Sequence, residues 1–238
     1  MMSVPRDDGH TSKYLVHWTG RKGEQAGLDN LSAIARTCRL RLSQNAFFFD
    51  GALRVVEDMA CFTDVPLWLS LPHCQRYGRY AIVFDKTKLM ARGAQPVFYF
   101  TYVFKRDMST IYNYIMSQLE KATIPPAIFE AFHRHFYYAQ EFSDGPVTNP
   151  AANYYEREWR LGEFSLIPES ENVGAYCYNH RLPQCIGRSV KDGSDIYFVI
   201  DPQDVAFLVA PKDHVAEVDN PHSFAVHPFE DVVSNEEE

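Results

Sequence analysis

The 238-residue sequence predicts an α+β fold, and two observations carry this prediction. The strand candidates are mostly joined by short connections, and the helical segments are grouped early and in the middle of the chain instead of alternating with strands. The length favours a single domain, 1–238, with one sizeable core. We expect that core at about 13–211, a helical insertion at about 109–141 and a weakly ordered acidic tail at 217–238.

The first half of the chain alternates apolar runs with one long amphipathic segment. Apolar residues recur at helical spacing from Asp29 to Leu42, where Asp29 or Asn30 can cap the helix. Pro66 is expected to open a short helix that runs to Tyr77. Four apolar runs predict strands: Lys13–Trp18, Ala60–Asp64, Arg79–Asp85 and Pro96–Phe104.

The middle of the chain changes character. From Ser109 onward the apolar residues have a helical period, Pro125 and Pro126 break the pattern, and a second helix is expected from Pro126 to Glu141. These segments predict a helical hairpin inserted between strands. Shorter strands are expected afterwards at about 162–167, 196–200 and 206–209.

Composition limits the class of function. A net charge of −8 argues against broad binding of a nucleic-acid backbone, although Arg36, Arg39 and Arg41 could line a local groove. The five cysteines are odd in number and widely spread, which indicates reduced thiols in a cytosolic protein. The sequence shows no signal peptide and no apolar run of membrane-spanning length, so we expect a cytoplasmic protein without a membrane partner.

The segment from Asn153 to Leu161 is the most informative stretch of the chain, since it combines two glutamates, two arginines and three aromatic residues. In a strand, Glu156, Glu158 and Arg160 would line one face, since side chains alternate. Two carboxylates on one face raise each other's proton affinity unless a cation or ligand intervenes. The segment is therefore either a salt-bridged surface or the acidic end of a site, and the pattern alone leaves both interpretations open.

An early strand offers a second candidate site. It places His17 and Thr19 on one face and ends at Gly20. A histidine can hydrogen-bond a ribose hydroxyl, and backbone beside a glycine can approach a flat amide closely. The alternative is a polar strand end next to a turn.

Two further patterns are weaker. Ser70, His73 and Tyr77 share a helical face that would either wall a ligand pocket or satisfy backbone groups at turns. Cys177, His180 and Cys185 have zinc-like spacing without an obvious fourth ligand, so no metal is expected. The sequence contains no glycine-rich phosphate loop and no Gly-x-Ser-x-Gly elbow, which disfavours P-loop and α/β-hydrolase chemistry.

Taken together and in order, these motifs resemble the AbiGi family, described as the antitoxin partner in an abortive-infection phage-defence pair of bacteria. The resemblance spans roughly Tyr14 to Pro211. It is carried by His17-x-Thr19-Gly20, Leu31-x-x-Ile34, Cys61-Phe62-Thr63-Asp64-x-Pro66, His73-x-x-x-Tyr77-Gly78-x-Tyr80 and Tyr155-Glu156-Arg157-Glu158-Trp159-Arg160.

The same order is similar, at greater distance, to ADP-ribosyltransferase folds. Those enzymes carry a His-x-Thr strand, a Leu-x-x-Ile helix and a late strand with a catalytic glutamate. In one branch of mono-ADP-ribosyltransferases this glutamate is part of a Glu-x-Glu motif, which Glu156-Arg157-Glu158 matches. This similarity implies split antiparallel sheets with flanking helices. Thr63 is a loose counterpart of their hydroxyl-bearing middle strand, whose pattern this sequence does not otherwise reproduce.

The resemblance implies NAD as a substrate, with no metal. Glu158 would stabilise the cationic ribose as the nicotinamide bond breaks, because a fixed carboxylate favours developing positive charge, and Glu156 would orient the acceptor or water. The cofactor-binding residues implied are His17, Thr19, Gly20, Thr63, Tyr77 and Tyr80. The protein would then transfer ADP-ribose or hydrolyse NAD. The alternative is a non-catalytic antitoxin that regulates a toxin from the same operon through protein contacts, for which the helical insertion is suited.

Overall fold

The computed structural model describes residues 12–49, 53–100, 102–121, 123–125, 128, 138–141, 157–163, 166–168, 170 and 187–233. These residues form mixed α and β structure, consistent with the predicted α+β class. Among them, no helix combines the length and the apolar character that crossing a bilayer requires.

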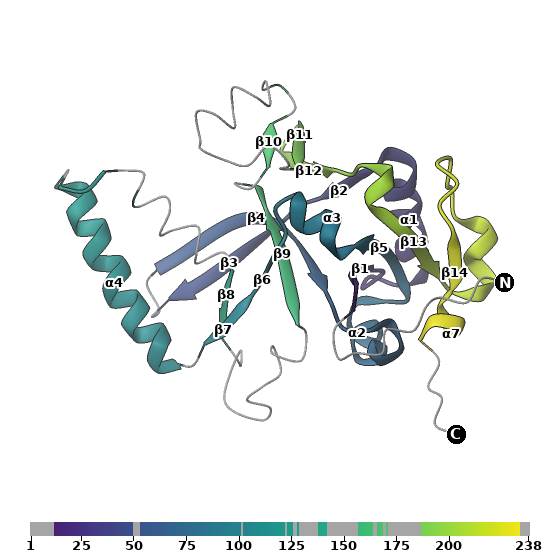
Figure 1. Cartoon of the computed structure of the whole chain (residues 1–238), viewed down its shortest axis with the longest axis horizontal. Coiled ribbons are helices and arrows are strands. Elements are labelled where there is room, and N and C mark those ends of the chain that lie inside the picture. The colour runs from purple at the N-terminus through teal and green to yellow at the C-terminus, as the bar shows by residue number, and fades with distance from the viewer. Residues whose placement is uncertain are drawn as a thin grey trace.

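The main sheet has eight strands in the order β14-β13-β5-β1-β4-β9-β6, and β3 pairs with β4 beside this path. All neighbours are antiparallel except β13 and β14, which run parallel. The strands are β1 (Tyr14–Thr19), β3 (Ser43–Phe49), β4 (Leu53–Thr63), β5 (Tyr80–Asp85), β6 (Gln95–Pro96), β9 (Glu158–Gly162), β13 (Val205–Ala210) and β14 (Val226–Pro228). Figure 1 shows β3 and β4 extending away from the rest of the sheet.

The two faces of this sheet are both covered. On one face, the buried side chains of Leu15, Phe62 and Ile82 pack with those of helix α1 (Glu24–Thr37). On the other, Val16, Trp18 and Val83 pack with residues of the 3-10 turn η1 (Leu67–Leu69) and the helices α2 (Leu71–Tyr77) and α7 (Phe229–Val232). Helix α3 (Lys86–Ala91) follows β5 directly, and Asp85 caps its N-terminus.

A second sheet joins distant parts of the chain. It has the order β10-β11-β12-β2, with β10 (Ile167–Pro168), β11 (Arg188–Asp192), β12 (Asp195–Val199) and β2 (Arg39–Arg41). The 3-10 turns η4 (Pro202–Asp204) and η5 (Lys212–Glu217) flank β13.

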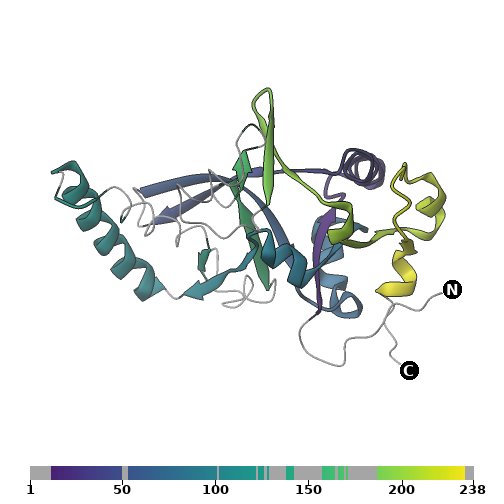
Figure 2. The ribbon, with the colours of Figure 1, turned by 45° about the horizontal axis from the view of Figure 1, so that its top comes forward.

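A third, small sheet lies at the base of a projecting segment. Strands β7 (Phe98–Phe100) and β8 (Ala139–Glu141) pair in parallel, and helix α4 (Tyr102–Glu120) follows β7. We call β7, α4 and β8 the arm. Figures 1 and 2 both show α4 at the end of the molecule remote from α1 and α7, and α4 contacts β3.

Several boundaries differ from the prediction. The helix expected at 29–42 is α1, which begins after Gly23 at φ 113° and ends at Thr37, because the C-cap residue Cys38 adopts a left-handed φ of 49°. The strand expected at 96–104 is the short pair β6 and β7, and residues from Tyr102 onward are helical.

The later segments also differ. Residues 139–141, expected to end a helix, form β8, while most of the expected second helix lies outside the described residues. The tail expected to be weakly ordered forms β14 and α7 up to residue 233. It does so because Phe229 and Val232 are buried against the sheet.

Candidate functional site

The predicted catalytic glutamate lies in an ion pair within its own strand. Arg160 donates from Nε to Oε1 of Glu158 at 2.8 Å and from Nη2 to Oε2 at 3.0 Å. The two side chains share one face of β9, as the alternation predicts. The strand itself begins at Glu158, because Arg157 adopts a left-handed φ of 45°.

Arg160 is among the few buried charged residues of the described chain, with a relative exposure of 3%. Burial alone would lower the pKa of its guanidinium, but the charge and hydrogen bonds of Glu158 outweigh burial, and the pKa is raised above its ordinary value. Arg160 also donates from Nη1 to the carbonyl oxygen of Ala139 at 3.2 Å. Both oxygens of Glu158 are thus held by a permanent cation.

The structure does not bring Glu158 and His17 to one cleft. In the register, Val16 lies opposite Thr63 and Thr63 lies opposite Glu158, so these three residues share one face of the sheet. His17 follows Val16 and points to the other face, where its ring contacts Phe62 at 5.9 Å between centroids. The NAD site inferred from the motif order would need both side chains on one side.

His17 itself is fixed by the neighbouring strand. Its Nδ1 donates to the carbonyl oxygen of Cys61 at 2.9 Å. Burial lowers the pKa of the imidazole, and the carbonyl contact opposes that effect only in part. The arrangement keeps His17 neutral and is typical of a satisfied core histidine.

The residues expected to hold the nicotinamide end are packed against one another. Tyr80 is 1% exposed, and Gly20 and Gly27 both face its ring. A Cβ at Gly27 would lie 2.3 Å from Cδ2 of Tyr80, so the glycine is required for the close approach of α1 to β5. The Tyr80 hydroxyl is hydrogen-bonded to Nδ1 of His214. Its ring is therefore core and offers no free face for stacking.

The remaining predicted site residues have separate local partners. Thr19 accepts a hydrogen bond at Oγ1 from Asn30 at 3.3 Å. Thr63 is buried and accepts at Oγ1 from the backbone N–H of Val65 at 3.2 Å, which is a turn contact. Tyr77 is half-buried on α2, where Arg76 lies 5.2 Å from its ring centroid. Glu156 lies outside the described residues, as do Cys177, His180 and Cys185.

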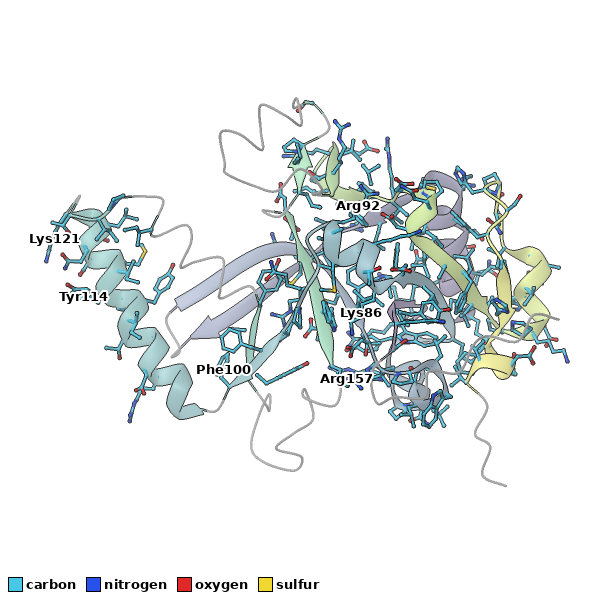
Figure 3. All side chains as sticks on the ribbon, viewed as in Figure 1. Lys86, Arg92, Phe100, Tyr114, Lys121 and Arg157 are labelled. Atoms are coloured by element: carbon cyan, nitrogen blue, oxygen red, sulfur yellow. The ribbon has the colours of Figure 1, made fainter. Side chains whose placement is uncertain are left out.

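A charged cluster beside β9 was not predicted. Asp64 is 5% exposed and pairs with Lys86 Nζ at 2.7 Å and Arg157 Nε at 2.9 Å. Lys86 also lies 4.7 Å from the ring centroid of Trp159. Figure 3 shows Lys86 and Arg157 in the middle of the molecule, away from α4. The sequence held one signal for this cluster: Asp64 lies between the apolar residues Phe62 and Val65. A carboxylate buried in such a segment must be paired with a cation.

Over the described ranges, no three side chains of histidine, cysteine, aspartate or glutamate are grouped so as to hold a metal ion. The contacts that the described residues make here are ion pairs and hydrogen bonds. The strongest of these contacts is the buried Arg160–Glu158 pair, which links β9 to the arm through Ala139.

Residues 39–178 match the model of the family described as "Putative abortive phage resistance protein AbiGi, antitoxin". The matched range runs from β2 to beyond β10 and includes Arg160, Glu158 and the arm. It begins after His17, Thr19 and Gly20. No match was found among curated proteins or among solved structures.

Proposed function

This chain belongs to the AbiGi family of abortive phage resistance antitoxins, and from that premise we propose that it acts by binding a partner toxin through the arm. An antitoxin implies a toxin to neutralise, and the family match covers the arm in full. The single observation that carries the proposal is the exposed apolar face of α4.

That face is built from residues at helical spacing. Ile111 and Tyr114 are 45% and 64% exposed, three residues apart, and the half-buried Ile115 continues the same stripe. Ser109, on the opposite side of the helix, and Tyr112, on the flank next to Ile115, are buried. Figure 3 shows Tyr114 and Lys121 at the remote end of the molecule. Tyrosine and large aliphatic residues in an exposed group are typical of a protein-binding surface.

The experiment measures binding of the toxin that we propose the same operon encodes. The double variant Ile111→Ala/Tyr114→Ala is expected to bind at least about 30-fold more weakly, since each interface anchor contributes about 1–2 kcal/mol. The matched control is Leu69→Ala/Met90→Ala, which removes two side chains of 43% and 49% exposure outside the arm. Wild-type affinity in the arm variant, with the fold checked by circular dichroism, would refute the proposal.

A second proposal, NAD binding with transfer of ADP-ribose or hydrolysis of NAD, is supported by the motif order of the sequence. In this proposal Glu158 supplies the catalytic carboxylate, and its ion pair with Arg160 must break before the carboxylate can contact the ribose. Purified protein and Glu158→Gln are compared for nicotinamide release from NAD. Release by the wild type and a loss of 100-fold or more in the variant would support this proposal. Equal release by both proteins, or none by either, would count against it.

A further inference from the structure

The base of the arm meets the main sheet along β9. The backbone N–H of Val97 donates to the carbonyl oxygen of Glu158 at 2.9 Å, and the N–H of Glu158 donates to the hydroxyl oxygen of Tyr99 at 2.9 Å. On the returning side, Arg160 reaches the carbonyl oxygen of Ala139. The outgoing and returning strands of the arm are thus both bonded to a three-residue stretch of β9, from Glu158 to Arg160.

The two strands of the base are also tied to each other. Phe98 donates its N–H to the carbonyl oxygen of Tyr138 at 2.7 Å, and Phe98 pairs with Ala139 in the β7–β8 register. Val97, Phe100, Tyr138 and Ala139 are all buried. A displacement of β8 would therefore move β7, from which α4 begins.

The Arg160 guanidinium links β9 to β8 through its bond to Ala139, and Glu158 holds it in one orientation. A guanidinium that forms two parallel bonds to a carboxylate has a fixed plane, which directs Nη1 at the carbonyl oxygen of Ala139. An ammonium group in the same place is a point charge and lacks this planar fork. The pair therefore has a geometric role in addition to its charge.

We propose that Arg160 and Glu158 are positioning residues that set the orientation of the arm and thereby present the Ile111–Tyr114 face to the toxin. This inference rests on the proposed function for the part that concerns the toxin. The anchoring of the arm to β9 is independent of any partner. Glu158, which the motif order assigns to NAD chemistry, would thus serve partner recognition from the base of the arm, away from the binding surface itself (Figure 1).

The test compares three variants of the full chain. Arg160→Lys keeps the charge and loses the planar fork, and Glu158→Gln/Arg160→Met removes both charges of the pair together. The control is Arg36→Met, which breaks an exposed ion pair with Asp219. For each, hydrogen exchange is measured at the amides of Val97, Phe98 and Glu158 and at those of β5, and the affinity for the toxin is measured separately.

Both pair variants are expected to exchange at least about tenfold faster at the arm base, with β5 unchanged, and to bind the toxin about tenfold more weakly. If the two charges serve only to neutralise each other, removing both should do no harm. The double variant Glu158→Gln/Arg160→Met would then show the exchange rates and the toxin affinity of the wild type. That recovery, or unchanged exchange in Arg160→Lys, would overturn the positioning role. The Ile111→Ala/Tyr114→Ala variant tests the toxin contact itself, so the two proposals can fail separately.

Discussion

His17 and Cys61 are joined across β1 and β4 by a hydrogen bond of 2.9 Å from the imidazole Nδ1 to the backbone carbonyl oxygen. Because the carbonyl can only accept, Nδ1 carries the proton in the neutral ring. Burial lowers the pKa of His17 below its ordinary 6.5, so the folded chain disfavours the second proton. This one contact links the stability of the sheet to pH.

The free energy of unfolding is expected to fall as the pH drops below about 6.5, by on the order of 1 kcal/mol. The unfolded chain binds the proton more readily in that range, so the contribution of His17 is full above 6.5 and declines toward its lowered folded pKa. The pKa values of Asp85 and Asp201 are lowered from the ordinary 3.8, so these two carboxylates change the free energy of unfolding only below about pH 3.8. Urea unfolding at pH 7 and pH 5 measures the slope, and His17→Gln should flatten it. An identical slope in the variant would assign it to other groups.

Gly27→Ala is expected to destabilise the fold by about 1–3 kcal/mol, because the new methyl group would overlap the Tyr80 ring and the structure must shift. Helix propensity alone predicts the opposite sign, a gain of up to about 1 kcal/mol for replacing a glycine inside α1. Thermal unfolding distinguishes the two. Gln25→Ala, at an exposed position of the same helix, is the control and should change stability little.

Arg160→Met is expected to cost about 3–5 kcal/mol, since it leaves the Glu158 carboxylate poorly exposed and without its cation. The comparison is Arg36→Met. Its partner is Asp219, both side chains are more than half exposed, and the loss should stay below about 1 kcal/mol. Denaturant unfolding of both variants measures the difference. Similar losses in the two variants would mean that the buried pair contributes no more than a surface one.

Cys74 is expected to resist alkylation in the folded chain. Burial raises the pKa of its thiol to about 12, and its Sγ donates to the carbonyl oxygen of Ser70 at 3.0 Å. At pH 8.5 the reactive thiolate is then roughly 1 in 3,000 of the population. Mass spectrometry after brief iodoacetamide treatment should find Cys74 unmodified in the native protein and modified in guanidinium. Rapid labelling under native conditions would contradict the buried position.

The sequence predicted the elements that have a continuous apolar pattern. The buried run Tyr80–Phe84 is β5, and the expected strands at 196–200 and 206–209 correspond to β12 and β13. The long hairpin of β3 and β4 was missed except for its last residues. The dipeptide Asp50-Gly51, flanked by Phe47–Phe49 and Leu53, was the signal that could have predicted it, since Asp-Gly between apolar runs is typical of hairpins.

The candidate site could be predicted only as a list of residues. Periodicity placed Glu158 and Arg160 on one face of a strand, and the structure confirms that relationship. It could not place His17 relative to them, because the face that a strand presents depends on its register with its neighbour, and a shift by one residue reverses it. The bond from Arg160 to Ala139 joins a side chain to a backbone oxygen 21 positions away and leaves no pattern in the sequence.

The parallel pairing of Phe98 with Ala139 brings the two ends of the arm side by side. A segment that leaves and re-enters a sheet at the same point can be shortened, lengthened or exchanged without rerouting the rest of the chain. Under the proposed toxin-binding role of α4, replacing this helix while β9 and its ion pair are kept is expected to change which toxin the chain binds. Transplanting α4 between two family members, with the junction left intact, would exchange their partners.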